Sequence, residues 1–92
     1  MVRVDGAIAG CVLVRAGSPH SFGEFFIVRR HRRSGVGTSV ARAVFRRFPG
    51  DWLVQQVPGI DAAVAFWRRA IPTAYQEIVT DSGTTQRFLA EA

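Results

Sequence analysis

The stretch from residue 24 to residue 57 constrains the fold more than any other part of the chain. A short apolar segment, 24–28, leads through a basic loop and two closely spaced glycines into a helix-patterned run that ends at Phe48. A second β-prone segment, 51–57, follows it. Strand, helix and strand in this order form a crossover that places the two strands parallel to each other. We therefore predict a βαβ unit at the centre of the fold.

Two segments carry the apolar periodicity of amphipathic helices. The apolar face of the first segment, 36–48, consists of Val36, Val40, Ala41, Val44, Phe45 and Phe48. Its other face carries Arg42, Arg46 and Arg47, for which helix solvation and ligand binding are both open interpretations. The second segment begins near Asp61, a candidate N-cap, and ends before Pro72.

The N-terminal segment predicts an antiparallel meander. Asp5-Gly6 between the β-prone runs 1–4 and 7–15 is a strong hairpin signal. The second run is apolar on both faces, as is typical of an interior strand. A short polar turn then leads to a third strand at 22–28, so three consecutive strands should pair antiparallel.

The C-terminal segment predicts a final hairpin, in which strands 74–80 and 84–89 flank a turn at Asp81-Ser82-Gly83. A chain of 92 residues fits one domain with a modest core, so we expect a single domain over residues 1–92. The predicted fold class is α/β (α+β): a mixed, mostly antiparallel sheet with a central βαβ crossover.

All twelve basic residues are arginine, and the formal net charge is +5. Most of them lie between positions 29 and 47, and no acidic residue occurs from Phe25 to Gly50. Concentrated positive charge attracts phosphates, acidic proteins or nucleic acid. Nucleic acid is the least favoured of these partners, because the arginines of the 29–33 loop lack interleaved aromatic residues and the glycines that follow would be unexplained.

Cys11 is the only cysteine, so no internal disulfide can form, and it has no zinc-binding spacing with His20 and His31. We expect no metal. An unpaired thiol suits a reducing compartment, and no apolar run approaches the length of a membrane span. These features predict a cytoplasmic protein that does not enter a membrane.

Gly35-Val36-Gly37 directly precedes the first predicted helix. Glycines allow the backbone to approach a ligand, and a helix start presents unpaired N–H groups and a positive dipole end. The loop is therefore an anion site, most plausibly for a diphosphate. A nucleoside-triphosphate P-loop requires a lysine and a dinucleotide fingerprint requires a glycine at position 40, which is Val40, so neither matches.

The pattern Arg32-x-x-Gly35-x-Gly37 lies between a strand and a helix, and a second strand and the helix segment Ala63-x-x-Phe66-Trp67 follow it. This arrangement resembles the GCN5-related N-acetyltransferases, a superfamily of acetyl-CoA-dependent acyltransferases. The resemblance covers about residues 2–89. It implies a truncated acyl-CoA N-acyltransferase fold, acetyl-CoA as cosubstrate and an amine acceptor whose identity is open.

The resemblance also implies roles for individual positions. Backbone N–H groups from Arg33 to Thr38 would bind the coenzyme A pyrophosphate, Arg32 would shape the loop, and backbone groups near residues 26–28 would pair with the pantetheine arm. The implied cofactor-binding residues are Phe26, Ile27, Val28, Arg32, Arg33, Ser34, Gly35, Val36, Gly37 and Thr38.

Glu24 stands where members of this superfamily can supply a general base, and a solvated carboxylate is its alternative interpretation. Many relatives have tyrosine as the acid for the leaving thiolate where this chain has Trp67, whose indole cannot act as an acid. Tyr75 is then a weak substitute and solvent another. Trp67 and Phe66 are better interpreted as core aromatics, and His31 as an exposed loop imidazole.

Superfamily members usually carry a strand and two helices before the strand that begins here near Val2, so the acceptor half of the site is expected from another chain or from a longer form. Because a sheet with parallel strands normally has both faces covered, a homodimer is expected. A non-catalytic coenzyme A binding or oligomerisation module is the alternative to an enzyme.

Overall fold

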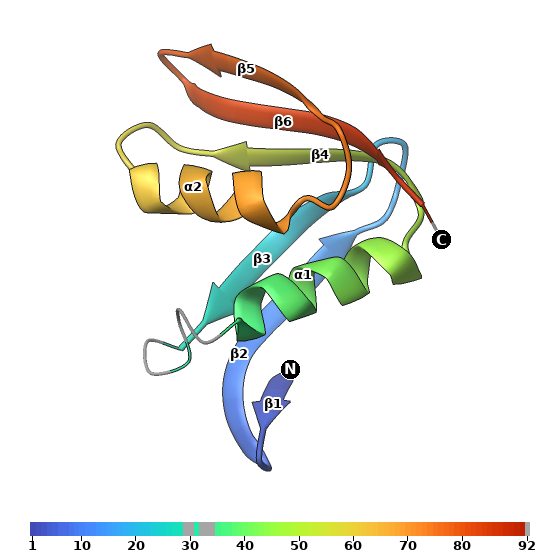
Figure 1. Ribbon diagram of the computed structural model, residues 1–92, viewed down its shortest axis with the longest axis vertical. Coiled ribbons are helices and arrows are strands. Elements are labelled where there is room, and N and C mark those ends of the chain that lie inside the picture. Colours follow the sequence, from blue (N-terminus) through green and yellow to red (C-terminus); the bar gives the residue numbers. More distant parts are fainter. Residues whose placement is uncertain (29–30, 32–34, 92) are drawn as a thin grey trace.

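The computed structural model describes residues 1–28, 31 and 35–91, which form the strands and helices shown in Figure 1. In chain order these are β1 (Val2–Val4), β2 (Ala7–Arg15), β3 (Ser21–Ile27), α1 (Val36–Arg47), β4 (Gly50–Gln56), α2 (Asp61–Ala70), β5 (Gln76–Thr80) and β6 (Gly83–Ala90). Neither described helix is long and apolar enough to cross a membrane.

The first sheet has the predicted meander order β1-β2-β3, with every pair antiparallel. The β1–β2 turn places Asp5 at φ 52° and Gly6 at φ 81°, the left-handed geometry that a tight hairpin needs. The predictions of an Asp-Gly hairpin and of an interior second strand are therefore confirmed.

The second sheet has the order β4-β6-β5, again antiparallel throughout. The predicted β5–β6 hairpin is confirmed, while the insertion of β6 between β4 and β5 is a feature that local sequence signals do not carry. The N-cap of α2 is Ile60 rather than Asp61. Asp61 is instead the first helical residue, where its negative charge suits the positive end of the helix dipole.

The central crossover joins the two sheets at one point. An isolated parallel bridge pairs His20 with Trp52, and two backbone hydrogen bonds support it: His20 N donates to Asp51 O (2.8 Å) and Leu53 N donates to His20 O (3.0 Å). Beyond this bridge β3 and β4 diverge as the two arms of a V (Figure 1). The parallel relation was predicted, but it extends over this bridge and not along the strands.

A bulge in β3 accompanies this divergence. The β2–β3 register runs from Leu13–Glu24 to Val14–Phe22, so Gly23 has no partner of its own on β2. An extra residue of this kind bends the strand and increases its twist. The bulge therefore turns β3 away from β4 and allows Phe22 and Phe25 to face the same side of the sheet.

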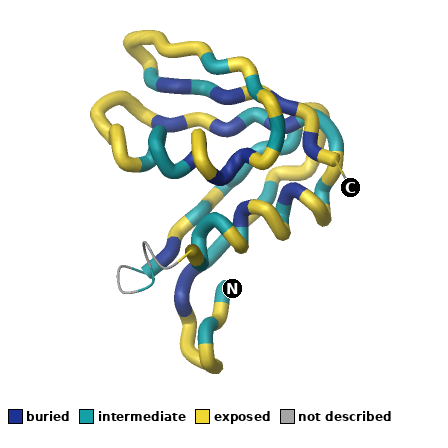
Figure 2. The backbone as a smooth tube through the Cα atoms, in the orientation of Figure 1, coloured by how far each residue is buried: buried dark blue, intermediate teal, exposed yellow. Residues whose placement is uncertain are grey.

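Both helices lie on one face of the sheets (Figure 1), and buried residues of the strands and helices are marked in Figure 2. The core that these residues form is rich in aromatic side chains. Trp52 is fully buried and its indole N–H donates to Phe48 O (2.7 Å). Trp67 is buried beside Phe22 and Phe25, with ring centroids 5.1 and 4.9 Å away. The interpretation of Trp67 as a core aromatic is therefore confirmed.

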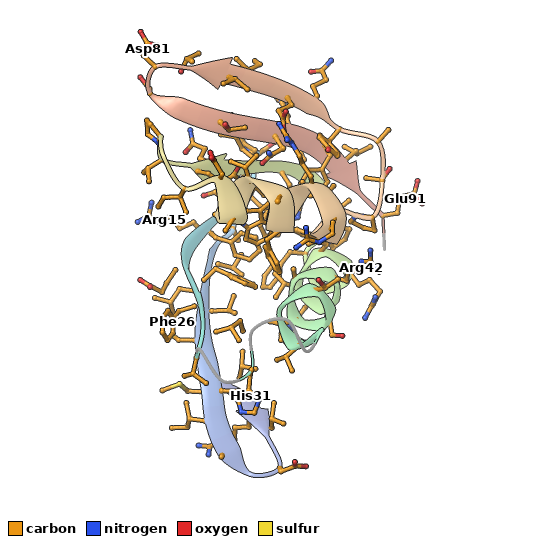
Figure 3. All side chains as sticks on the ribbon, turned by 60° about the vertical axis from the view of Figure 1, so that its left-hand side comes forward. Arg15, Phe26, His31, Arg42, Asp81 and Glu91 are labelled. Atoms are coloured by element: carbon orange, nitrogen blue, oxygen red, sulfur yellow. The ribbon has the colours of Figure 1, made fainter. Side chains whose placement is uncertain are left out.

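The described residues leave the opposite face of the sheets uncovered. Successive strand residues alternate between faces, so every second side chain points away from the helices. Exposed apolar side chains on this face include Leu13, Phe26, Ile78 and Leu89, each 47% exposed or more. Figure 3 shows Arg15 and Phe26 on this side of the molecule and Arg42 on the other.

A chain of polar side chains ties α2 to the second sheet. Arg68 donates through two nitrogens to the Glu77 carboxylate (2.9 and 2.7 Å), and Gln86 Nε2 donates to the same carboxylate (2.9 Å). Gln56 Nε2 in turn donates to Gln86 Oε1 (2.8 Å). Since a carboxylate only accepts, Glu77 sets the orientation of both amides. These hydrogen bonds link α2 to β5, and β5 through β6 to β4.

The hydrogen bonds of Glu77 make the free energy of unfolding sensitive to acid. Hydrogen bonds from Arg68 and then from Gln86 lower the pKa of Glu77 from 4.5 to about 2. A lowered folded-state pKa adds stability above the pKa of the unfolded state, and this contribution is lost as pH falls toward 2. Arg68→Gln should therefore reduce the decline in the free energy of unfolding between about pH 5 and pH 2, measured by urea denaturation. Arg69→Gln makes the same charge change on the same exposed helix end and should keep the decline of the wild type. A similar change in both variants would contradict the role of Glu77.

Candidate functional site

The diverging arms of β3 and β4 enclose an open cleft of about 400 Å³. Gly23 and Glu24 of β3 form one wall, and Leu53 and Gln55 of β4 form the other. Trp67 of α2 is part of the lining, so the aromatic core and the cleft share a side chain. The bulge and the single bridge are what open this space, because paired strands would close it.

Glu24 lies in this cleft, as a catalytic carboxylate would require. It pairs across the sheet with Leu13, and its side chain is exposed on the face away from the helices. The ion pairs of the described residues are formed by other carboxylates, Glu77 and Asp51. The carboxylate of Glu24 is therefore available to a molecule that enters the cleft.

Tyr75 lies elsewhere. It follows α2, is half-buried and packs against the core cluster. Its phenol is close enough to Arg68 to contribute to the raised pKa of that guanidinium, after the larger effects of Glu77. Tyr75 is not among the residues that line the cleft, whereas Gln55 and Trp67 both are.

The start of α1 has the form of an anion site. Gly35 is the N-cap residue with φ 85°, a left-handed conformation that favours glycine, and no side chain of the described residues caps the helix. The first turn contains no acidic residue. Ser39 N donates to Gly35 O (3.0 Å), which is the first hydrogen bond of the helix. The N–H groups of Val36, Gly37 and Thr38 come before it and have no partner within the helix.

The other predicted loop positions, Arg32, Arg33 and Ser34, lie outside the described residues, as do Arg29 and Arg30.

The end of β3 connects to the neighbouring strand and to the loop. Val28 N donates to Ala9 O of β2 (2.6 Å), and His31 N donates to Val28 O (3.0 Å). Phe26 is exposed and Ile27 is buried. His31 is half-buried rather than exposed, which corrects the prediction, since its backbone hydrogen bond to Val28 holds it at the end of β3.

Gly37 has a packing role that the sequence pattern did not reveal. A Cβ at this position would lie 3.0 Å from Phe66 Cε1 of α2 and 3.6 Å from Ile27 Cγ1 of β3. The missing side chain therefore lets α1, α2 and the end of β3 meet. The second glycine of the Gly-x-Gly pair serves this contact whether or not a ligand is bound.

Arg42 also joins the helices. Its Nε donates to Ala70 O (3.3 Å) and a terminal nitrogen donates to Arg69 O (3.1 Å), so it satisfies carbonyls at the C-terminal end of α2. This contact between the two helices was not among the interpretations left open for Arg42, which were helix solvation and ligand binding. Arg46 and Arg47 are exposed at the end of α1.

His20 is the residue that sequence analysis most clearly missed. Gly17 N donates to its Nδ1 (2.9 Å), which places the proton on Nε2, and Nε2 donates to Pro49 O (3.0 Å). Its ring packs on Trp52 and Phe48, with centroids 5.4 and 6.0 Å away. Because Pro49 is 29 residues away in the chain, no local motif could indicate this contact.

The described residues contain no group of three His, Cys, Asp or Glu side chains placed to hold a metal ion. Cys11 is a free, partly exposed thiol.

The fold resembles that of a solved protein, although no family model matches the sequence and no curated protein matches it significantly. The chain is similar to the crystal structure of Ard1 from Thermoplasma volcanium, with a TM-score of 0.70 and 16% sequence identity. The match covers 97% of this chain and 68% of the Ard1 chain. The protein therefore shares the mixed α+β fold of Ard1, which confirms the predicted fold class. At this identity the likeness establishes the fold alone.

The contact between Gly37 and Phe66 generates a prediction. Gly37→Val would place methyl groups against the Phe66 ring, so the helices must separate, and we expect the free energy of unfolding to fall by about 1–3 kcal/mol in urea denaturation. Ala43→Val, at an exposed position of the same helix, should cost only about 0.5 kcal/mol through helix propensity. Equal losses in the two variants would show that the contact is not tight.

Proposed function

We propose that this chain binds acetyl-CoA and transfers the acetyl group to an amine. The observation that carries the proposal is the open cleft between β3 and β4, with Glu24 among the residues that line it. The uncapped start of α1 lies near the far end of β3, since Gly37 is close to Ile27. The acetyltransferase fold and the pattern Arg32-x-x-Gly35-x-Gly37 support the same reading.

The cofactor would lie along the V. Backbone N–H groups from Arg33 to Thr38 would bind the pyrophosphate, because unpaired donors and a positive dipole end stabilise an anion at a helix start. Arg32 would shape this loop. The pantetheine arm would follow the end of β3 near residues 26–28, in the manner of an added strand, and would direct the thioester into the cleft.

The chemistry requires a neutral amine to attack the thioester carbonyl. The C–N bond forms, the C–S bond breaks and coenzyme A leaves as a thiolate. In this proposal Glu24, directly or through a water molecule, accepts the proton that the amine loses. The thiolate takes a proton from solvent, because the cleft is open, Trp67 has no acidic proton and Tyr75 lies against the core.

We also propose that the protein acts in the cytoplasm as a homodimer. The exposed apolar side chains of Leu13, Ile78 and Leu89 lie on the face that the two helices leave uncovered. A second copy on this face would bury them and would supply the acceptor side of the cleft. Sedimentation of a monomer at micromolar concentration would contradict the dimer.

Binding of the cofactor is tested by calorimetry with acetyl-CoA. The wild type should bind, and Gly35→Glu should weaken binding by about tenfold or more, because it places a negative charge at the anion site and a side chain at φ 85°. Gly6→Glu is the matched control: its φ is 81°, and neither glycine has atoms within 4 Å of an added Cβ. Absence of binding by the wild type, or equal binding by the Gly35 variant, would refute the proposal.

Catalysis is tested by the release of coenzyme A thiol across a panel of amines. Glu24→Gln should lower kcat by about a hundredfold or more while acetyl-CoA affinity is kept, since a base acts on the proton and not on the cofactor. Asp81→Asn, in the exposed β5–β6 turn, is the control that should retain full activity. A non-catalytic coenzyme A binding module, which the presence of Trp67 and Gln55 in the cleft favours, would instead bind acetyl-CoA without turnover.

A further inference from the structure

Arg15 reaches the same cleft by an unusual route. It is the last residue of β2, yet it lines the space between β3 and β4. It does so by lying over Gly23: a Cβ at Gly23 would be 3.3 Å from Arg15 Nε and 3.6 Å from Arg15 Cγ. The absence of a side chain at the bulge residue therefore leaves room for the arginine to cross β3 in this position. Figure 3 shows the Arg15 side chain projecting from the sheet on the side away from Arg42.

The guanidinium of Arg15 is available for a ligand. The ion pairs found among the described residues join Arg68 to Glu77 and Arg87 to Asp51, and Arg15 takes part in neither. It is exposed and contributes no hydrogen bond to the described fold beyond the strand itself. Within the described lining of the cleft, Arg15 is the one cation and Glu24 is the one carboxylate.

A cleft lined by one cation, Arg15, and one carboxylate, Glu24, suits a molecule that carries both an anionic and a cationic group. A planar guanidinium presents paired donors that match a carboxylate. A cleft of about 400 Å³ accommodates a small molecule or a short chain end. We infer that the amine acceptor is a small amino acid-like molecule, whose carboxylate binds Arg15 while its amine lies at Glu24. This inference rests on the proposed acetyl transfer and names its acceptor class.

The test compares amino acids with amines that lack the carboxylate, using the full chain with acetyl-CoA. We expect kcat/KM for γ-aminobutyrate or β-alanine to exceed that for butylamine or ethylamine by about tenfold or more, since hydrogen bonds to charged groups are strong. Arg15→Gln should remove this preference through KM, with kcat nearly unchanged. Arg46→Gln, an exposed arginine of α1, should keep it. Equal use of acids and alkylamines by the wild type, or a preference that survives in Arg15→Gln, would overturn the inference.

A third kind of acceptor tests whether Arg15 binds a carboxylate or a phosphate-like group. Aminopropylphosphonate has the same amine and a phosphonate in place of the carboxylate. Stronger use of the phosphonate, lost in Arg15→Gln, would overturn the carboxylate assignment in favour of a phosphate-bearing acceptor.

A binding measurement separates this inference from the proposed function. In an NMR titration, millimolar γ-aminobutyrate should shift the Arg15 Nε–Hε signal and butylamine should not. If acetyl-CoA binds in the calorimeter and γ-aminobutyrate leaves this signal unchanged, the acceptor assignment is wrong and the proposed function stands. If the signal shifts and acetyl-CoA does not bind, the carboxylate site stands and acetyl transfer is refuted.

Discussion

The structure depends on the single point at which its two sheets meet. The backbone of His20 forms hydrogen bonds to the β4 residues on both sides of Trp52. The His20 ring is hydrogen-bonded to the backbone of Gly17 and of Pro49. Longer pairing would have produced one continuous sheet with no space between β3 and β4. The His20–Trp52 bridge instead keeps β3 and β4 together at one end, and the bulge at Gly23 bends β3 away from β4 beyond it. The cleft is a consequence of this geometry.

The two faces of the sheets carry different kinds of side chain. The helices cover one face, where aromatic side chains pack around the fully buried Trp52 and Phe45. The other face carries Glu24 and Arg15 beside exposed apolar side chains. Trp67 belongs to both, since it lies in the core and lines the cleft. The polar chain from Arg68 to Gln56 holds α2, and hence Trp67, in register with the second sheet.

Much of the fold could be predicted because its signals are local. The Asp5-Gly6 turn requires positive φ, and the apolar periodicity around Phe45 requires a buried helix face. Glu24 was singled out as a candidate general base through the likeness of the Gly-x-Gly loop and its surroundings to a known pattern, whereas its place in the lining of the cleft is a result of the tertiary structure. The contact of Gly37 with Phe66, the role of His20 and the route of Arg15 over Gly23 were not foreseen, because each joins segments whose approach no local pattern specifies.

The sequence by itself determined the order and type of the elements, the antiparallel hairpins at both ends and a helix start at the Gly35-Val36-Gly37 segment, since turn chemistry and periodicity act over a few residues. The tertiary structure decided the rest. It inserted β6 between β4 and β5, limited the parallel contact to one bridge and brought Arg15 and Glu24 into one cleft while Tyr75 packed in the core. These outcomes depend on which distant surfaces bury each other best, a property of the whole chain that no short segment encodes.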